Sequence, residues 1–270
     1  MTELTEVKDF WDAASCGEVY ATGHDARAQY EQQRISRYQL EPYLLEFARF
    51  DTAKNKDVLE IGVGMGADHQ QLAENSPKSL TGIDLTPRAI EHVKARFALF
   101  NLNSRLETGN AEALHFADES FDLVYSWGVI HHSPNTAIAA KEIHRVLRPG
   151  GTARVMIYHR YSLVGLMLWA RYGLLKGRPF TSFDEIYSEH LESPGTKAYT
   201  VAQGRELFRD FASVDVRAIC TFGDLLIGEV GQRHRGVLLS VAKAIWPRPI
   251  IRALSKRVNL GLYLLIEAKK

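Results

Sequence analysis

The sequence predicts an α/β protein built on a doubly wound, mostly parallel sheet. From about residue 56 to residue 158, short apolar runs alternate with helical stretches, which is the pattern of repeated strand–helix–strand units. The runs are apolar on both faces, as expected for parallel strands that helices cover on both sides. Two further apolar runs near the carboxyl end bring the expected number of strands to seven.

Each element follows from a local signal. Five strands are expected in the alternating region, at residues 57–62, 80–84, 104–108, 121–126 and 152–158. Thr86-Pro87 predicts the start of a helix that runs to about residue 100, because proline tolerates the first helical turn. A second helix is expected over 135–147, before the terminator Arg-Pro-Gly-Gly at 148–151.

Outside this region the sequence predicts one more helix, two strands and three additional segments. A helix is expected over 201–211, and strands over 213–220 and 261–269. The additions are a helical N-terminal segment (1–45) and insertions after the fifth and sixth strands (159–198 and 221–257). Without an internal repeat or a clear linker, residues 1–270 are expected to form one domain.

Composition bounds the class of protein. With 46% hydrophobic and 24% charged residues in 270, the chain is expected to be globular rather than disordered, collagenous or coiled-coil. Its two cysteines, Cys16 and Cys220, lie far apart and suggest neither a metal cluster nor a disulfide framework, which predicts a cytoplasmic protein. The polar, acidic first ten residues do not resemble a signal peptide.

The net charge of +1 is distributed unevenly along the chain. It argues against a general nucleic-acid binder, yet residues 231–257 hold seven Lys or Arg and no Asp or Glu. Such a segment can form a surface for an anionic partner. Peripheral membrane contact through 231–257 is one interpretation, and a solvated or core-facing amphipathic helix pair is the other.

The glycine-rich segment at 58–68 is the most informative motif. A buried strand leads into Gly62, Gly64 and Gly66, and a helix follows. Glycines there allow a sharp turn and close approach of a ligand to the backbone, beside the unpaired N–H groups of a helix. The spacing Gly-x-Gly-x-Gly differs from that of pyrophosphate-binding NAD enzymes, and it is no P-loop.

Two polar elements follow the next two strands. Asp84 stands at the carboxyl end of the second strand, where a carboxylate can accept both hydroxyls of a ribose. Residues 109–112, Gly-Asn-Ala-Glu, come directly after the third strand, where an adenine edge could meet a backbone N–H and a polar side chain. The three elements in this order predict a nucleoside-containing ligand.

With these motifs the chain resembles the class I S-adenosylmethionine-dependent methyltransferases, particularly the methyltransferase type 11-like group that acts on small molecules. The resemblance rests on residues 58–68, 82–90, 109–134 and 142–151. It implies a Rossmann-like methyltransferase fold and S-adenosyl-L-methionine as the cofactor. It says little about the methyl acceptor.

The resemblance also implies roles for individual residues. The implied cofactor-binding residues are Glu60, Gly62, Gly64, Gly66, Asp84, Leu85, Asn110, Ala111, Glu112 and Ser126. Glu60 would orient the methionine amino group, Asp84 would bind the ribose, and Leu85 would pack on the adenine. Many relatives carry Asp where this chain has Asn110, whose amide oxygen can still accept a hydrogen bond from the adenine amino group.

Methyl transfer from a sulfonium requires alignment of the acceptor and, for some acceptors, removal of a proton. The candidate bases are His131 and His132 after the fourth strand, followed by Tyr158 and His159 at the end of the fifth. Third candidates from the N-terminal segment are Tyr20, Tyr30 and Arg34. The other histidines, among them His69, are expected on the surface or on helix faces.

The two insertions favour a hydrophobic or amphipathic small-molecule acceptor. Residues 161–175 carry one charge, Arg171, and predict a lid helix over the site or a buried helix. Methylation of oxygen is placed slightly ahead of methylation of carbon or nitrogen.

Two other classes of protein are alternatives to a methyltransferase. One is a nicotinamide-dependent oxidoreductase, which the glycine spacing disfavours, and the other is a non-catalytic cofactor-binding or membrane-associated protein. The residues before the basic segment carry more acidic than basic side chains, which disfavours RNA as the substrate.

Overall fold

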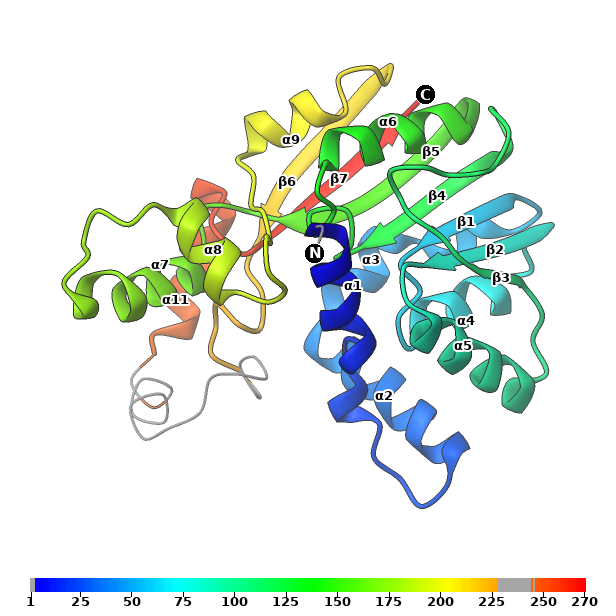
Figure 1. The fold of residues 1–270 in the computed structure, drawn as a ribbon, viewed down its shortest axis with the longest axis horizontal. Helices are drawn as coiled ribbons and strands as arrows, with labels where there is room; N and C mark the ends of the chain where they lie inside the picture. The colour runs from blue at the N-terminus through cyan, green and yellow to red at the C-terminus, as the bar shows by residue number, and fades with distance from the viewer. Residues whose placement is uncertain (1–2, 228–243, 245) are drawn as a thin grey trace.

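A computed structural model describes residues 3–227, 244 and 246–270. Seven strands form one sheet in the order β3-β2-β1-β4-β5-β7-β6 (Figure 1). Their bounds are β1 (Asp57–Ile61), β2 (Ser79–Asp84), β3 (Arg105–Thr108), β4 (Phe121–Trp127), β5 (Leu147–Tyr158), β6 (Ser213–Ile219) and β7 (Tyr263–Lys269). The first five are parallel and β7 pairs antiparallel with both of its neighbours. The predicted seven-stranded, mostly parallel sheet is confirmed.

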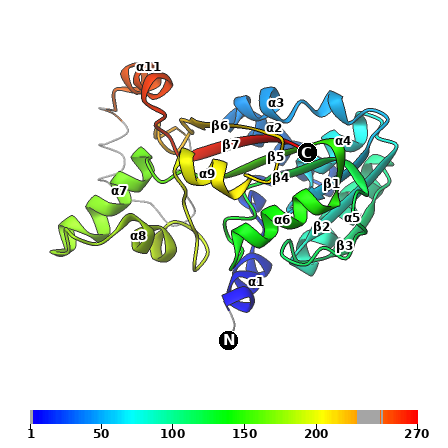
Figure 2. The ribbon, with the colours of Figure 1, turned by 90° about the horizontal axis from the view of Figure 1, so that it is seen from above.

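Helices cover both faces of the sheet (Figure 2). They are α1 (Glu3–Ala13), α2 (Ala26–Leu40), α3 (Pro42–Ala48), α4 (Ala67–Glu74), α5 (Pro87–Phe100), α6 (Thr136–Val146), α7 (Leu163–Tyr172), α8 (Phe183–His190), α9 (Val201–Leu207) and α11 (Arg248–Val258). In β1, Val58 packs with α3, α4 and α5, whereas Leu59 and Ile61 pack with α6 and α9. This alternation explains why Val58, Leu59 and Ile61 are all apolar although they point to different faces.

Side chains at the helix starts explain where several helices begin. Thr86 accepts a hydrogen bond from the N–H of Ala89 at the start of α5, and Asn135 does the same for Ile138 at the start of α6. Thr200 forms a reciprocal capping box with Gln203 at α9. Each cap satisfies a backbone donor that the helix itself leaves unpaired.

Two predicted bounds were wrong. Strand β5 begins at Leu147 and not at residue 152, because Leu147 pairs with Phe121 before a shift in register brings Thr152 opposite Leu123. The glycine-containing terminator at 148–151 therefore ends α6 but lies inside the strand. Helix α9 ends at Leu207 rather than at residue 211.

The additions lie around one end of the sheet. The N-terminal segment is helical, as expected, and α1 contributes Leu4, Val7 and Trp11 to the wall of a pocket at this end. Helix α7 packs against α8, and none of the described lining residues comes from α7, whereas Glu192 of the same insertion does line the pocket. A lid over the site and a buried helix both stay predictions for residues 161–175. None of the helices in the described part of the chain is long and apolar enough to span a membrane.

Most of the basic segment 231–257 lies outside the described residues, and α11 is its main described part. Ile250 is 67% exposed and Val258 is 56% exposed, and Arg252 and Arg257 are exposed as well. These two apolar side chains of the expected amphipathic segment therefore face solvent and not the core.

Candidate functional site

The pocket lies at the carboxyl ends of the central strands. Strand β1 has β2 on one side and β4 on the other, so the chain changes direction along the sheet between β1 and β4. A crevice outside the carboxyl ends at such a switch point is the usual ligand site of an open α/β sheet. The residues after β1, β2, β3 and β4 all contribute to this pocket, so the topology brings the three predicted motifs together.

The glycine turn after β1 has the shape that a bound ligand requires. Gly62, Gly64 and Gly66 all have positive φ, at 83°, 49° and 77°. A side chain at Gly62 would overlap Val129, and one at Gly66 would come within 2.9 Å of Val93. At Gly64, by contrast, no described atom lies within 4 Å of the place a Cβ would take. The missing side chain leaves a cradle that is open to the pocket.

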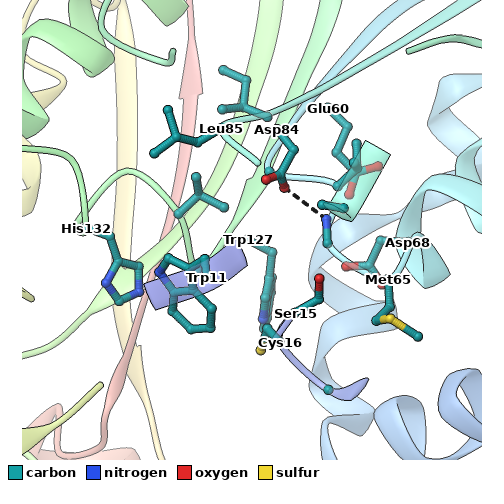
Figure 3. A pocket seen from close by; sticks show the side chains of 18 of the residues that line it. Trp11, Ser15, Cys16, Glu60, Met65, Asp68, Asp84, Leu85, Trp127 and His132 are labelled. Atoms are coloured by element: carbon teal, nitrogen blue, oxygen red, sulfur yellow. Dashed lines mark hydrogen bonds between the residues drawn. The ribbon is translucent and has the colours of Figure 1, made fainter. Parts of the chain in front are cut away.

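Asp84 at the end of β2 faces this cradle. Its Oδ2 accepts a hydrogen bond from the N–H of Gly64 at 3.1 Å (Figure 3), and its Oδ1 accepts from the N–H and the hydroxyl of Thr86. Burial raises the pKa of Asp84, while these hydrogen bonds act in the opposite direction. The carboxylate is thus held in one orientation beside the turn, as ribose recognition requires.

Glu60 lines the pocket but has a partner within the protein. Its Oε2 lies 2.8 Å from Nδ1 of His69, which is fully buried. Of the two places expected for His69, the surface or a helix face, it takes the second, on a buried face of α4. The first turn of α4 packs directly on the sheet, and burial lowers the pKa of His69 to about 3 while it raises the pKa of Glu60. Sequence spacing did not reveal this pair.

At the adenine end, Leu85, Asn110 and Ala111 line the pocket, as the resemblance implied. Two other implied residues are not among its described lining. Glu112 accepts a hydrogen bond from the N–H of Asn135 at 2.6 Å, and Ser126 is fully buried within the sheet. Their roles toward the cofactor remain predictions.

The opposite end of the pocket is aromatic. Trp11, Trp127, Tyr158 and Tyr263 line it together with apolar residues of α1. The rings of Trp127 and Tyr263 meet edge to face at 5.7 Å between centroids, and those of Tyr158 and Tyr263 stack at 5.9 Å. Figure 3 shows Trp11, Trp127 and His132 apart from Asp84 and Glu60. These packed rings give the pocket an apolar surface that a hydrocarbon part of a ligand could contact.

The predicted bases occupy different places. His132 and Tyr158 line the pocket, whereas His131 is fully buried and is not among the described lining residues. Burial lowers the pKa of His131 and therefore keeps the ring neutral. Nδ1 of His159 donates a hydrogen bond to the carbonyl oxygen of Gly261 at 3.0 Å.

Of the candidate bases in the N-terminal segment, one lines the pocket and two do not. Tyr20 lines the pocket. The hydroxyl of Tyr30 lies 3.5 Å from Nδ1 of His92, and Arg34 pairs with Glu31 and Glu74. Neither Tyr30 nor Arg34 is among the described lining residues.

Sequence reasoning missed three charged residues that line the pocket, Arg37, Glu41 and Glu192. Arg37 of α2 holds Asp68 through two hydrogen bonds, and Glu41 lies 3.4 Å from the same guanidinium. Glu192, in the insertion after β5, accepts a hydrogen bond from the hydroxyl of Tyr158 at 2.6 Å. No motif marked these residues, because their partners lie far away in the sequence.

The fold and the glycine cradle with its facing carboxylate define a nucleoside-binding α/β domain of the methyltransferase type. Residues 59–155 match a family described as a methyltransferase domain. A solved S-adenosylmethionine-dependent methyltransferase from Mesorhizobium loti superposes with a TM-score of 0.54 at 17% identity, over 83% of this chain and 97% of that one. This likeness concerns the fold.

Relatives agree with the family match. The chain is 29% identical over 145 residues to 2-methyl-6-phytyl-1,4-hydroquinone methyltransferase of Synechocystis sp., covering 51% of this chain and 45% of the relative. It is 34% identical over 122 residues to fatty-acid O-methyltransferase of Mycolicibacterium smegmatis, covering 45% and 43%. Residues 59–155 therefore match a methyltransferase domain, and the relatives that share this region are methyltransferases. The chain spans less than half the length of these two relatives.

Proposed function

We propose that this protein transfers a methyl group from S-adenosylmethionine to a small hydrophobic or amphipathic acceptor, with oxygen as the favoured methylated atom. The observation that carries the proposal is one pocket with two different ends. The glycine cradle and Asp84 line one end, and aromatic side chains line the other. A cofactor held at the first end would present its sulfonium toward an acceptor at the second.

The residues at the first end fit the cofactor. The open cradle at Gly64 admits the ligand close to the backbone, and the oriented carboxylate of Asp84 would accept hydrogen bonds from the ribose. Leu85, Asn110 and Ala111 would contact the adenine. The bound cofactor supplies an electrophilic methyl group, and the protein's part is to exclude water and align the acceptor.

The second end supports an apolar acceptor. Leu4, Val7 and Trp11 of α1 face it together with the aromatic wall. Apolar linings of this kind bind molecules through burial of hydrocarbon surface, and a few polar groups set the orientation. The two relatives named above act, by their names, on a phytyl-substituted hydroquinone and on a fatty acid, which are both acceptors with long hydrocarbon parts. These observations support the acceptor class.

Two measurements test the proposal. S-adenosylhomocysteine should raise the melting temperature of the protein and NAD should leave it unchanged; the reverse result would favour an oxidoreductase. Labelled methyl transfer from S-adenosylmethionine into fractions of a cell extract, followed by mass spectrometry of the product, would identify the acceptor. Binding of S-adenosylhomocysteine without any labelled product would favour a non-catalytic role.

We also propose that α11 contacts an anionic membrane surface. The exposed Ile250 and Val258 stand beside the exposed Arg252 and Arg257, and this combination suits the interface of an acidic bilayer. The full-length protein should co-sediment with phosphatidylglycerol vesicles at low salt and not with phosphatidylcholine vesicles. Ile250→Asp should abolish co-sedimentation, and equal recovery with both vesicles would contradict the idea.

A further inference from the structure

His132 is held in one tautomer by hydroxyl groups of the insertion after β5. Its Nδ1 lies 2.8 Å from Oγ of Ser193 and 3.1 Å from Oγ1 of Thr196. The hydroxyl of Thr196 already donates its hydrogen to the carbonyl oxygen of Ser193 at 2.7 Å. Oγ1 of Thr196 can therefore only accept from His132, and the hydroxyl of Ser193, which could donate to Nδ1 or accept from it, lies 3.3 Å from Oγ1 of Thr196. With the hydrogen on Nδ1, both hydroxyls accept from His132 and Ser193 donates to Thr196, so this tautomer satisfies every contact in the group. Nε2 is left with a free lone pair.

This lone pair has no hydrogen-bond donor among the described residues. Nε2 of His132 is buried and unpaired, in a side chain that is 5% exposed. The atom lies 3.5 Å from Oε2 of Glu192, which itself only accepts hydrogen bonds. A buried polar atom without a partner is costly, and two acceptors that face each other repel. The arrangement therefore favours a ligand that donates a hydrogen between them.

The surrounding charges narrow the class of ligand further. The carboxylates among the described lining residues are Glu41, Glu60, Asp68, Asp84 and Glu192. Arg37 is the one guanidinium or ammonium group in that described set, and Asp68 already holds it in two hydrogen bonds. Other titratable groups around His132 include His131 and Tyr158, whose rings lie 4.1 Å and 6.0 Å away, and Lys197, whose ammonium group is held by Glu3 and by the carbonyl oxygens of Ser133 and Gly195. An ionised carboxylate would find no free cation in this described lining and would be repelled.

We propose that His132 and Glu192 form the subsite that binds a neutral hydroxyl acceptor, with His132 as the base that removes its proton. This proposal rests on the proposed methyl transfer and deepens it. The acceptor oxygen forms a bond to the methyl carbon as the bond from that carbon to sulfur breaks. The hydroxyl proton moves to Nε2 of His132, and the adjacent carboxylate of Glu192 stabilises the resulting imidazolium. The proton then leaves to solvent.

Tyr158 and Trp11 support this subsite. The hydroxyl of Tyr158 donates to the same Oε2 of Glu192 that lies near His132, so it fixes the carboxylate without competing for the imidazole. The ring of Trp11 meets His132 edge to face at 5.3 Å between centroids (Figure 3). The first contact restricts the carboxylate that stabilises the imidazolium, and the second restricts the imidazole that receives the proton.

The first test measures ligand binding by calorimetry with the full chain saturated with S-adenosylhomocysteine at pH 8. The probes are 4-octylphenol, a neutral hydroxyl compound, and decanoate, an anion of similar length. The wild type should bind 4-octylphenol about tenfold or more tightly than decanoate. Glu192→Gln should narrow this ratio to about threefold by strengthening the binding of decanoate, because it removes a charge that repels the carboxylate, while 4-octylphenol binds much as before. Glu189→Gln, an exposed neighbour on α8, should keep the wild-type ratio.

The second test measures methylation of 4-octylphenol with labelled S-adenosylmethionine. His132→Asn should lower kcat about 100-fold and leave the affinity for S-adenosylhomocysteine unchanged. Glu192→Gln should lower kcat with little change in KM, which a loss of folding or of acceptor contact would not produce.

Separate outcomes identify which idea fails. If S-adenosylhomocysteine does not bind the wild type, the proposed function itself is wrong. If it binds, but decanoate binds as well as 4-octylphenol or neither binds, the hydroxyl subsite is wrong. Methylation of 4-octylphenol by His132→Asn at the wild-type rate would also overturn it.

Discussion

Arg37 and Asp68 join the N-terminal segment to the cofactor turn. Nε and Nη2 of Arg37 lie 2.8 Å and 2.6 Å from Oδ1 and Oδ2 of Asp68. Asp68 stands in the first turn of α4, directly after the glycine turn, and its carboxylate also accepts hydrogen bonds from Tyr38 and Tyr125. Helix α2, which precedes the sheet in sequence, is thereby tied to the glycine turn of the proposed cofactor site.

Arg37→Gln should destabilise the fold. The substitution leaves Asp68 buried without its cation, and breaking one side of a buried ion pair costs about 3 kcal/mol. Chemical denaturation followed by circular dichroism would measure this loss. Arg34→Gln removes a more exposed pairing on the same helix and should cost less than about 1 kcal/mol. Equal losses in the two variants would show that the Arg37 pair has no special role.

Asp84→Ala should weaken cofactor binding without unfolding the protein. It removes the oriented carboxylate and the hydrogen bond that Asp84 accepts from Gly64. Charge-assisted hydrogen bonds contribute about 1.5–3 kcal/mol each, so the affinity for S-adenosylhomocysteine should fall about tenfold or more by calorimetry. Asp215→Ala, at an exposed position of β6, is the matched control and should bind as the wild type does. Undiminished affinity in Asp84→Ala would move the ribose site elsewhere.

His69 should make the protein less stable in mild acid. Burial lowers its pKa from 6.5 to about 3, so between these values the unfolded chain binds a proton that the folded protein does not. The stability that His69 contributes is present above pH 6.5 and is lost as the pH falls toward 3. Melting temperatures at pH 7 and pH 5 would measure this loss. In His69→Gln the drop should be smaller, and an identical drop would exclude His69 as its source.

Trp11→Ala should weaken acceptor binding more than cofactor binding. Trp11 lines the aromatic end of the pocket and contacts the ring of His132. Loss of its buried surface should lower the affinity for 4-octylphenol about tenfold, while the affinity for S-adenosylhomocysteine changes less than about threefold. Calorimetry with each ligand would measure both. Lys8→Ala, on an exposed position of the same helix, should change neither, and parallel losses for both ligands would indicate a general role of α1.

Local patterns were sufficient to predict the sheet and the cofactor turn. The strand order places the residues after β1, β2 and β3 at one edge, and the glycines and Asp84 act through the backbone and side chain of their own segments. Apolar runs, glycine spacing and helix caps are short-range features, so the printed sequence contains the information needed to recognise them.

The end of the pocket proposed for the acceptor could not be predicted from the sequence, because it is formed by contacts between segments that lie far apart in the chain. Ser193 lies 61 residues from the His132 that it orients, and Arg37 lies 31 residues from Asp68. His69 reads as an ordinary helical residue until α4 packs on the sheet and buries it. Such pairs form only when loops and insertions take up their places over the sheet, because burial and charge pairing are properties of the surroundings rather than of a residue and its neighbours in the chain.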